Sequence, residues 1–248
     1  MPTDYTIKPG SWLSDEEYCT FLKHWSTLGH DPYWRDRFEL CSLLALGAGL
    51  RVSEMVEIYV EPAAGKSYCQ VVDGPEGPQA RLYLFGTKGK GGGKKGRIAP
   101  ERHRLAQVIP ELVPQFQRRY ERRVQEGHAL LFSRPDGTPY RVLTFQTWWM
   151  DVMRLCEIDR GMIQGRDGRL RHDRPSIHEG RHTFATWEVA ARRLNAEEVA
   201  AQIGNDPTTT RTTYQHAILE TLFLENKTPQ WRTLAASVFT ERKLRVAG

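Results

Sequence analysis

Strand-forming residues are concentrated in one stretch of this chain, and this concentration is the strongest constraint on its fold. Residues 67–72 and 80–85 are expected to be strands separated by the turn segment 73–78, and a third short strand is expected at 97–100. The remaining segments mostly have helical spacing. The pattern predicts an α+β fold that is mainly α, with a small antiparallel three-stranded sheet embedded among helices.

Capping residues and apolar spacing predict where the helices begin and end. Ser14 and Glu17 have the form of a capping box, and the helix they begin continues to Gly29. A second helix covers about 31–47, and Ser53 caps a short third one. Further helices are expected near residues 101–126, 143–157, 179–193, 196–203 and 208–222.

Composition and charge exclude several classes of protein. The chain is 40% hydrophobic and 26% charged, which fits a folded globular protein, and no apolar run is long enough to span a membrane. The N-terminus lacks a secretion signal, so a cytoplasmic location is expected. None of the four cysteines forms a Cys-x-x-Cys pair, which argues against a zinc knuckle or a redox dithiol.

The net charge of +5 is compatible with a polyanionic partner. Many basic proteins bind no nucleic acid, however, so charge alone does not identify the partner. The basic segment 166–174 is expected to be an exposed loop, which either contacts DNA phosphates or is simply solvated.

Four separate segments carry residues suited to phosphate chemistry, and the first is GAGLRVSEM at 47–55. Arg51 follows a glycine turn there, and its planar guanidinium can donate two hydrogen bonds to phosphate oxygens. Glu54 is expected to hold Arg51 or the local turn. The alternative is a surface arginine on an ordinary helix turn.

The second segment, GTKGKGGGKKGRIAP at 86–100, lies between two predicted strands. Its lysines can act as general acids, because neighbouring cations and partial burial lower the pKa of an ammonium group. Lys88 directly follows a strand and is the first choice for that role, with Lys90 as the alternative. The segment is not a P-loop, since no serine or threonine follows a Gly-Lys pair. The competing interpretation is a flexible, solvated basic loop.

The third segment, HEGRHTFAT at 178–186, contains the pattern His-Glu-x-x-His, which on a helix can bind zinc. Gly180 weakens such a helix, and no further histidine stands at the spacing of a third ligand. A zinc metallopeptidase is therefore retained only as the less favoured alternative.

The fourth segment, residues 201–216, places Tyr214 about two turns into a helix that begins with Asp206 as N-cap and Pro207 as first residue. A tyrosine on an amphipathic helix is, on its own, more often a packed core residue than a nucleophile.

Taken in order, the four segments resemble the catalytic domain of tyrosine recombinases of the phage-integrase family. The resemblance covers about residues 12–225, and Asn205 departs from it, because the family usually has histidine or tryptophan there. Asparagine can donate a hydrogen bond to a phosphate oxygen but carries no positive charge. The family's catalytic positions fall on Arg51, Lys88, His178, Arg181, Asn205 and Tyr214.

The resemblance implies site-specific cleavage and rejoining of double-stranded DNA through a 3′-phosphotyrosine on Tyr214, without metal or cofactor. Arg51 and Arg181 would bind the phosphate, and Lys88 would protonate the leaving oxygen from the minor groove. His178 would bind the phosphate or help to take the tyrosine proton. His182 is expected only to brace the helix packing.

Two alternatives share this fold: a DNA-binding protein with weak or no cleavage, and DNA relaxation of the type IB topoisomerase kind. We expect the catalytic residues to meet in one basic cleft. If Tyr214 were buried in the core, or more than a loop movement away from both arginines, the enzymatic interpretation would fail.

The domain organisation follows from the same resemblance. Residues 1–225 are expected to form the catalytic domain, and residues 226–248 a tail with a short amphipathic helix. In this family such a helix often docks on a neighbouring subunit, which predicts a homo-oligomer, a tetramer on DNA. The alternative is that the tail packs on its own domain. The family's core-binding domain is absent, so the sequence is either a catalytic fragment or a minimal member.

Overall fold

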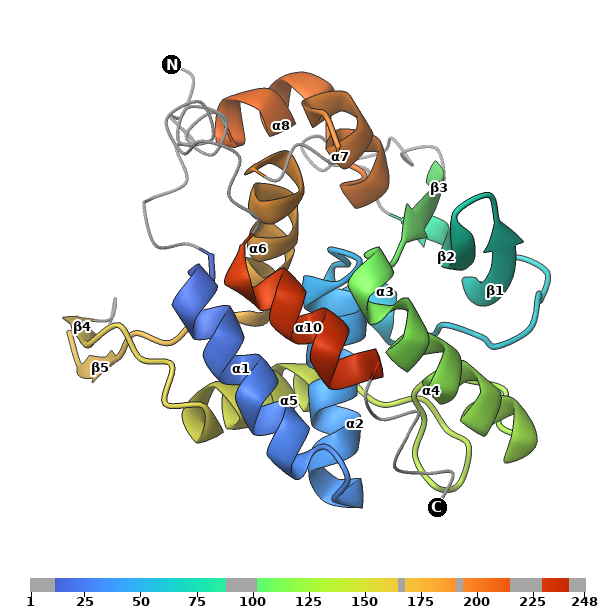
Figure 1. The fold of residues 1–248 in the computed structure, drawn as a ribbon, viewed down its shortest axis with the longest axis horizontal. Helices are drawn as coiled ribbons and strands as arrows, with labels where there is room; N and C mark the ends of the chain where they lie inside the picture. The colour runs from blue at the N-terminus through green and yellow to red at the C-terminus, as the bar shows by residue number, and fades with distance from the viewer. Residues whose placement is uncertain (1–11, 88–101, 165–167, 191–193, 215–228, 241–248) are drawn as a thin grey trace.

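The computed structural model describes residues 12–87, 102–164, 168–190, 194–214 and 229–240. The architecture is mainly helical with a three-stranded antiparallel sheet at one side (Figure 1), as the sequence predicts. Within these ranges no helix is both long and apolar enough to cross a membrane. The longer helices are α1 (Asp15–Leu28), α2 (Pro32–Leu40), α4 (Val113–Gln125), α5 (Val142–Leu155), α6 (Ile177–Ala190), α7 (Ala196–Ile203), α8 (Pro207–Thr213) and α10 (Gln230–Thr240).

The first helix begins at its predicted cap and the second at its predicted start, whereas the third does not begin at its predicted cap. Ser14 accepts a hydrogen bond from the backbone N–H of Glu17, and the Glu17 carboxylate accepts one from the backbone N–H of Ser14, so the capping box before α1 is confirmed. Asp31 caps α2 with its side chain alone, by accepting hydrogen bonds from the backbone N–H groups of Tyr33 and Trp34. The chain then continues as a buried π-helical turn, η1 (Cys41–Leu46), which leads to the short helix α3 (Val52–Met55). The prediction that Ser53 caps this helix is wrong, because α3 begins directly after Arg51 and Ser53 is its second residue.

The sheet has the order β1–β2–β3, formed by β1 (Tyr68–Gly74), β2 (Gly77–Thr87) and β3 (Arg102–Gln107). The third strand therefore lies in a segment for which we predicted a helix, and that prediction is wrong. Ala106 pairs with Leu82 and both side chains are buried, so pairing with β2 outweighs helix propensity. The helix is delayed until α4, after the 3-10 turn η2 (Pro110–Leu112). The strand predicted at 97–100 lies outside the described residues.

A second correction concerns the basic segment before α6. We predicted a loop at 166–174, but β4 (Met162–Gln164) and β5 (Leu170–His172) form a two-stranded antiparallel hairpin. Its side chains are exposed, as predicted. The three-residue strands are too short to produce a clear alternating pattern in the sequence.

Helix α10 packs on its own chain along α1 (Figure 1). The ring of Trp231 stacks on Tyr18 at 4.5 Å, and both side chains are 1% exposed. The carboxylate of Asp15 accepts hydrogen bonds from the backbone N–H groups of Gln230 and Trp231, at 3.0 and 2.9 Å. The tail thus adopts the alternative arrangement in this single chain. Exchange onto a neighbouring subunit stays a prediction, and the predicted boundary at 225/226 lies outside the described residues.

The four cysteines are free thiols, in agreement with the absence of a paired motif in the sequence. Cys41, Cys69 and Cys156 are buried and Cys19 is half-buried, and burial raises the pKa of all four. They behave as small apolar residues of the core.

Candidate active site

Gly49 forms the tight turn that delivers Arg51 to the start of α3. Its φ of +63° favours glycine, and a Cβ there would stand 2.6 Å from Phe184 Cδ1 and 3.1 Å from Ile203 Cγ2. Only a residue without a side chain lets the backbone pass this close to α6 and α7. Arg51 is therefore brought against helices that are distant in the sequence.

Arg51 is held by both of its ends. The Glu54 carboxylate accepts hydrogen bonds from the Arg51 backbone N–H at 2.8 Å and from its guanidinium at 2.9 Å, so the predicted role of Glu54 as the holder of Arg51 has a structural basis. The guanidinium also donates to the carbonyl of Gly204 and to Oδ1 of Asn205, both at 3.1 Å. Its side chain stays 29% exposed, so it remains accessible to a ligand.

Arg181 reaches the same point from α6. It donates to the carbonyl oxygens of Gly49 and Ile203 and to Oδ1 of Asn205, the last at 3.0 Å. The residue is only 2% exposed. Burial lowers the pKa of Arg181, and the positive charges of Arg51 and Arg104 lower it further.

Asn205 lies where the two guanidiniums meet. Its amide oxygen accepts hydrogen bonds from Arg51 and Arg181, and only an oxygen can do so, because both partners are donors. Helix α7 ends just before it at Gly204, in the left-handed conformation. The Asn205 oxygen therefore occupies a position between two cations where an anionic oxygen would bind favourably.

A third guanidinium, which no sequence motif indicated, adjoins these two. Arg104 projects from β3 and donates to the Glu54 carboxylate and to the carbonyl of Gln202. Among the described residues, Glu54 is the single carboxylate that contacts any of the three arginines. The cluster thus has an excess of positive charge.

Two histidines on α6, the helix that carries Arg181, lie beside each other, and one of them contacts the tyrosine. His178 is exposed, and its ring meets that of His182 edge to face at 4.7 Å. Nδ1 of His182 shares a hydrogen bond of 3.0 Å with the Tyr214 hydroxyl. We had assigned His182 only a packing role. Its spacing of four from His178, which places both on one helix face, was the sequence signal for a role at the site.

Tyr214 ends α8, and its side chain is buried. It is 1% exposed and packs with the apolar core. Burial raises the pKa of Tyr214 to about 12, although the nearby charge of Arg181 opposes this rise. The expectation of an accessible tyrosine in a cleft is wrong for this conformation. By the criterion set above, Tyr214 is not placed here to attack DNA.

Lys88 and Lys90, the two candidates for the general acid, lie outside the described residues. Gly180 has a packing function, because a Cβ there would stand 2.8 Å from the Trp149 ring and 3.0 Å from Ala45. No three His, Cys, Asp or Glu side chains in the described part of the chain are grouped as metal ligands. A zinc site on His178 and His182 would therefore lack a third protein ligand there.

Comparison with known proteins identifies the fold. No family sequence model matches the chain, and no curated protein sequence does either. The XerA recombinase structure matches with a TM-score of 0.55 at 15% identity, covering 88% of this chain and 65% of that one. The XerH site-specific recombinase bound to difH substrate, in a pre-cleavage complex, matches with a TM-score of 0.51 at 16% identity, covering 90% and 56%.

The chain has the fold of a tyrosine recombinase catalytic domain. It spans less than two thirds of the length of either of these recombinase chains. At such identities the similarity defines the fold alone, so activity and partners have to be argued from the site.

Proposed function

We propose that this protein cleaves and rejoins double-stranded DNA in the cytoplasm, as a site-specific recombinase or integrase with Tyr214 as nucleophile. The observation that carries the proposal is the convergence of Arg51 and Arg181 on one acceptor atom, Oδ1 of Asn205, at 3.1 and 3.0 Å. Two guanidiniums directed at one point form a binding site for a phosphate oxygen. The Tyr214 hydroxyl shares a hydrogen bond with His182, which lies on α6, the helix that also carries Arg181.

In the proposed reaction the Tyr214 oxygen attacks phosphorus and forms a 3′-phosphotyrosine. The phenolic proton passes to Nδ1 of His182, in the tautomer that leaves this nitrogen unprotonated. The bond to the 5′ oxygen breaks, and Lys88 protonates that oxygen. Arg51, Arg181 and His178 stabilise the charge that grows on the phosphate oxygens. A 5′-hydroxyl reseals the break by attacking the phosphotyrosine, so no ATP is consumed.

A change of conformation has to precede this step. Tyr214 is buried and its raised pKa favours the neutral phenol, so the described arrangement corresponds to a resting state. The Asn205 oxygen also has to leave the position between the guanidiniums, since the phosphate would compete for the same donors. DNA supplies the compensating interactions, because each guanidinium exchanges a neutral acceptor for a charged one.

The test is covalent capture on nicked duplexes. A pool of nicked DNA with random sequence around the nick removes the need to guess a target site. We expect a denaturant-resistant protein–DNA adduct with the wild type and none with Tyr214→Phe. Absence of adduct from the wild type, while both proteins bind the pool equally well, would contradict the proposal.

A second candidate function is DNA binding without efficient cleavage. The burial of Tyr214 favours it, because the tyrosine cannot reach DNA in this conformation while the arginines remain arranged to bind a phosphate. The neutral Asn205 favours it too. The capture assay separates the two candidates, because a binding protein retains the DNA in both variants and forms no adduct.

The assembly is a separate proposal. We propose a homotetramer on DNA in which α10 leaves its own α1 and docks on a neighbour, since both sites bury the same apolar stripe. Removal of residues 228–248 should reduce the size of the DNA-bound complex. A complex of unchanged size, formed by a less stable truncated protein, would show that the tail acts only within its own chain.

A further inference from the structure

Arg104 is a buried cation that connects the sheet to the arginine cluster. Its side chain is 7% exposed, and it bridges the Glu54 carboxylate and the carbonyl of Gln202 at the end of α7. No part of the proposed reaction uses it. Burial and the neighbouring charge of Arg51 both disfavour the charged form of Arg104, and the Glu54 carboxylate offsets them.

On one side Arg104 acts on the carboxylate that holds Arg51. Oε2 of Glu54 accepts from the Arg51 backbone N–H and from Arg104, and Oε1 accepts from the Arg51 guanidinium. Arg104 therefore restricts the rotation of the Glu54 carboxylate, which in turn fixes the Arg51 side chain. Glu54 itself is only 7% exposed, so water does not replace a lost partner freely.

On the other side Arg104 supports the turn that presents Asn205. A Cβ on Gly204 would stand 2.8 Å from Arg104 Cδ and 3.0 Å from its Nε, so the arginine lies directly against this turn. The Gly204 carbonyl and the Asn205 oxygen both accept hydrogen bonds from Arg51. Arg104 thus contacts both structures that hold Arg51, the Glu54 carboxylate and the Gly204–Asn205 turn.

Arg104 lies on β3, so its bridge joins the three-stranded sheet to α7 and to the arginine cluster. It pairs with Leu84 of β2, and β2 ends at Thr87, directly before Lys88 in the sequence. A second hydrogen bond joins β3 to α7, because the Gln202 side chain donates to the backbone carbonyl of Gln107 at 2.6 Å. Two hydrogen bonds from side chains thus join β3 to the end of α7, next to the arginine cluster.

We propose that Arg104 is a positioning residue: through Glu54 and the Gly204–Asn205 turn it sets the geometry with which Arg51 binds a DNA phosphate. The proposal rests on the proposed function, in that it takes a phosphate of double-stranded DNA as the ligand. Arg104 itself does not contact the phosphate.

The test is a double-mutant cycle on DNA affinity, performed in the Tyr214→Phe background so that cleavage is not required. Affinity for one fixed duplex is measured over a range of salt concentrations for Arg51→Ala, Arg104→Met and the double variant. Arg51→Ala should weaken binding about tenfold or more and reduce the salt slope by about 0.9, the value for one lost phosphate contact. Arg104→Met should weaken binding to a similar extent, and the double variant little further.

Two further variants keep the result interpretable. Arg104→Lys retains the charge but cannot bridge Glu54 and Gln202 with one planar fork, so it should resemble Arg104→Met. Arg211→Met removes an arginine whose side chain is 67% exposed, and its effect should add to that of Arg51→Ala. If Arg104→Met does not fold, Arg104→Lys carries the cycle alone.

The outcomes separate this inference from the proposed function. Additive losses for Arg51 and Arg104, unchanged affinity in Arg104→Met, or full affinity in Arg104→Lys would each overturn the role of Arg104. Unchanged affinity in Arg51→Ala would instead overturn the phosphate cluster, and the positioning role with it. Coupling without any covalent adduct from the wild type would support Arg104 and contradict cleavage.

Discussion

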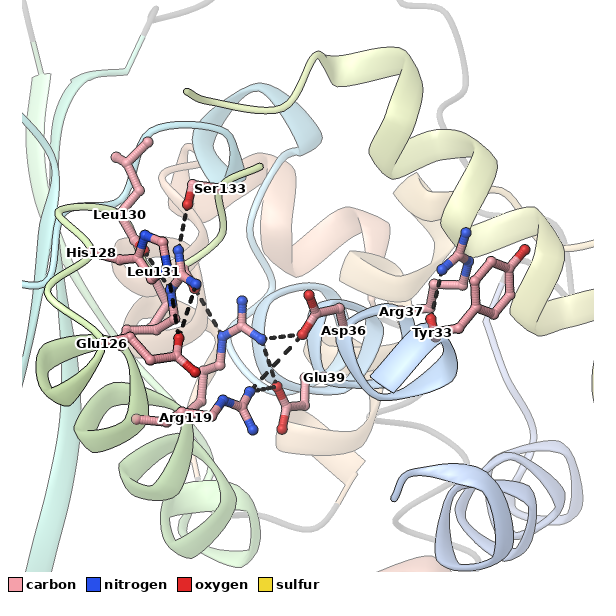
Figure 2. Close-up of polar contacts among 12 residues, drawn as sticks. Tyr33, Asp36, Arg37, Glu39, Arg119, Glu126, His128, Leu130, Leu131 and Ser133 are labelled. Carbon is pink, nitrogen blue, oxygen red and sulfur yellow. Dashed lines mark hydrogen bonds and ion pairs between the residues drawn. The ribbon is translucent and has the colours of Figure 1, made fainter. Parts of the chain in front are cut away.

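Two groups of arginines in this molecule differ in how their charge is balanced. Between α2 and α4, Arg119 and Arg122 contact the carboxylates of Asp36 and Glu39 (Figure 2). Arg119 and Glu39 have side chains 2% and 0% exposed. Two cations meet two anions there, so this α2–α4 cluster satisfies itself within the fold.

At the candidate active site the same residue type is left unbalanced. Arg51, Arg104 and Arg181 contact a single carboxylate among the described residues, that of Glu54. Their other acceptors are backbone carbonyls and the amide of Asn205, which carry no charge. The two groups share the residue type and differ in charge balance. The arginines at the candidate site are left with positive charge that an anionic ligand would neutralise, whereas those between α2 and α4 are not.

Breaking the balanced cluster should have the largest effect on stability. Arg119→Met leaves the fully buried Glu39 with one cation fewer, and we expect the free energy of unfolding to fall by about 3–5 kcal/mol. Urea unfolding measures this, and DNA affinity per folded molecule should be unchanged. A loss below about 1 kcal/mol, the value of an exposed pair, would mean that the cluster is not a structural element.

Arg181→Met should slow adduct formation strongly and reduce stability less, the reverse of Arg119→Met. Removing one donor to the developing phosphate charge should slow adduct formation by about 10²–10³-fold. The loss of stability should be smaller than for Arg119→Met, because the variant also removes a buried charge repelled by Arg51 and Arg104. Rates from the capture assay and urea unfolding measure the two effects. Equal stability losses in the two variants would remove the distinction between the clusters.

The helical segments and their caps were predictable because local signals determine them. Ser14 and Asp206 cap helices as predicted and α2 begins at its predicted start, whereas Ser53 was predicted as a cap and is not one. Strand β3 was not predictable, because it depends on pairing with β2, a contact that local spacing does not encode. The hairpin β4–β5 was too short to leave a pattern.

The site shows a similar division. Arg51, Arg181 and Asn205 stand in motifs, and the structure brings them together. Arg104 stands in no motif, since its role comes from the distance between β3 and α7 after folding. The burial of Tyr214 matches the general expectation for a tyrosine on an amphipathic helix, whereas the motif specifies only the residue and not its conformation.

Tyr214 allows a third test, through pH. Its folded pKa of about 12 lies above its ordinary value of 10.0, so the folded state favours the neutral phenol. Stability from this group is fully present below about pH 10 and is lost as pH rises toward 12, by about 2–3 kcal/mol. Tyr214→Phe should lack this loss in urea unfolding at increasing pH, whereas Tyr33→Phe, at an exposed position, should behave as the wild type. Identical profiles for wild type and Tyr214→Phe would contradict the buried resting state.

Asn205→His should have the smallest of these effects, a change in the salt dependence of DNA binding. It tests the charge balance of the arginine cluster directly, because it adds a titratable group there. A histidine is neutral above its ordinary pKa of about 6.5. Below it, the phosphate of bound DNA favours protonation against the neighbouring guanidiniums, and the protonated ring adds a cation to the complex. Relative to wild type at the same pH, the salt slope of DNA binding should be unchanged at about pH 8 and steeper by up to about 0.9 at about pH 5.5. The comparison at equal pH cancels any pH dependence that both proteins share. Asn205→Ala is the matched control, because it removes the acceptor oxygen of Arg51 and Arg181 without adding a titratable group. If Asn205→His showed the same slope at both pH values, residue 205 would not contact the phosphate, and its oxygen would serve only to hold the two arginines in the resting state.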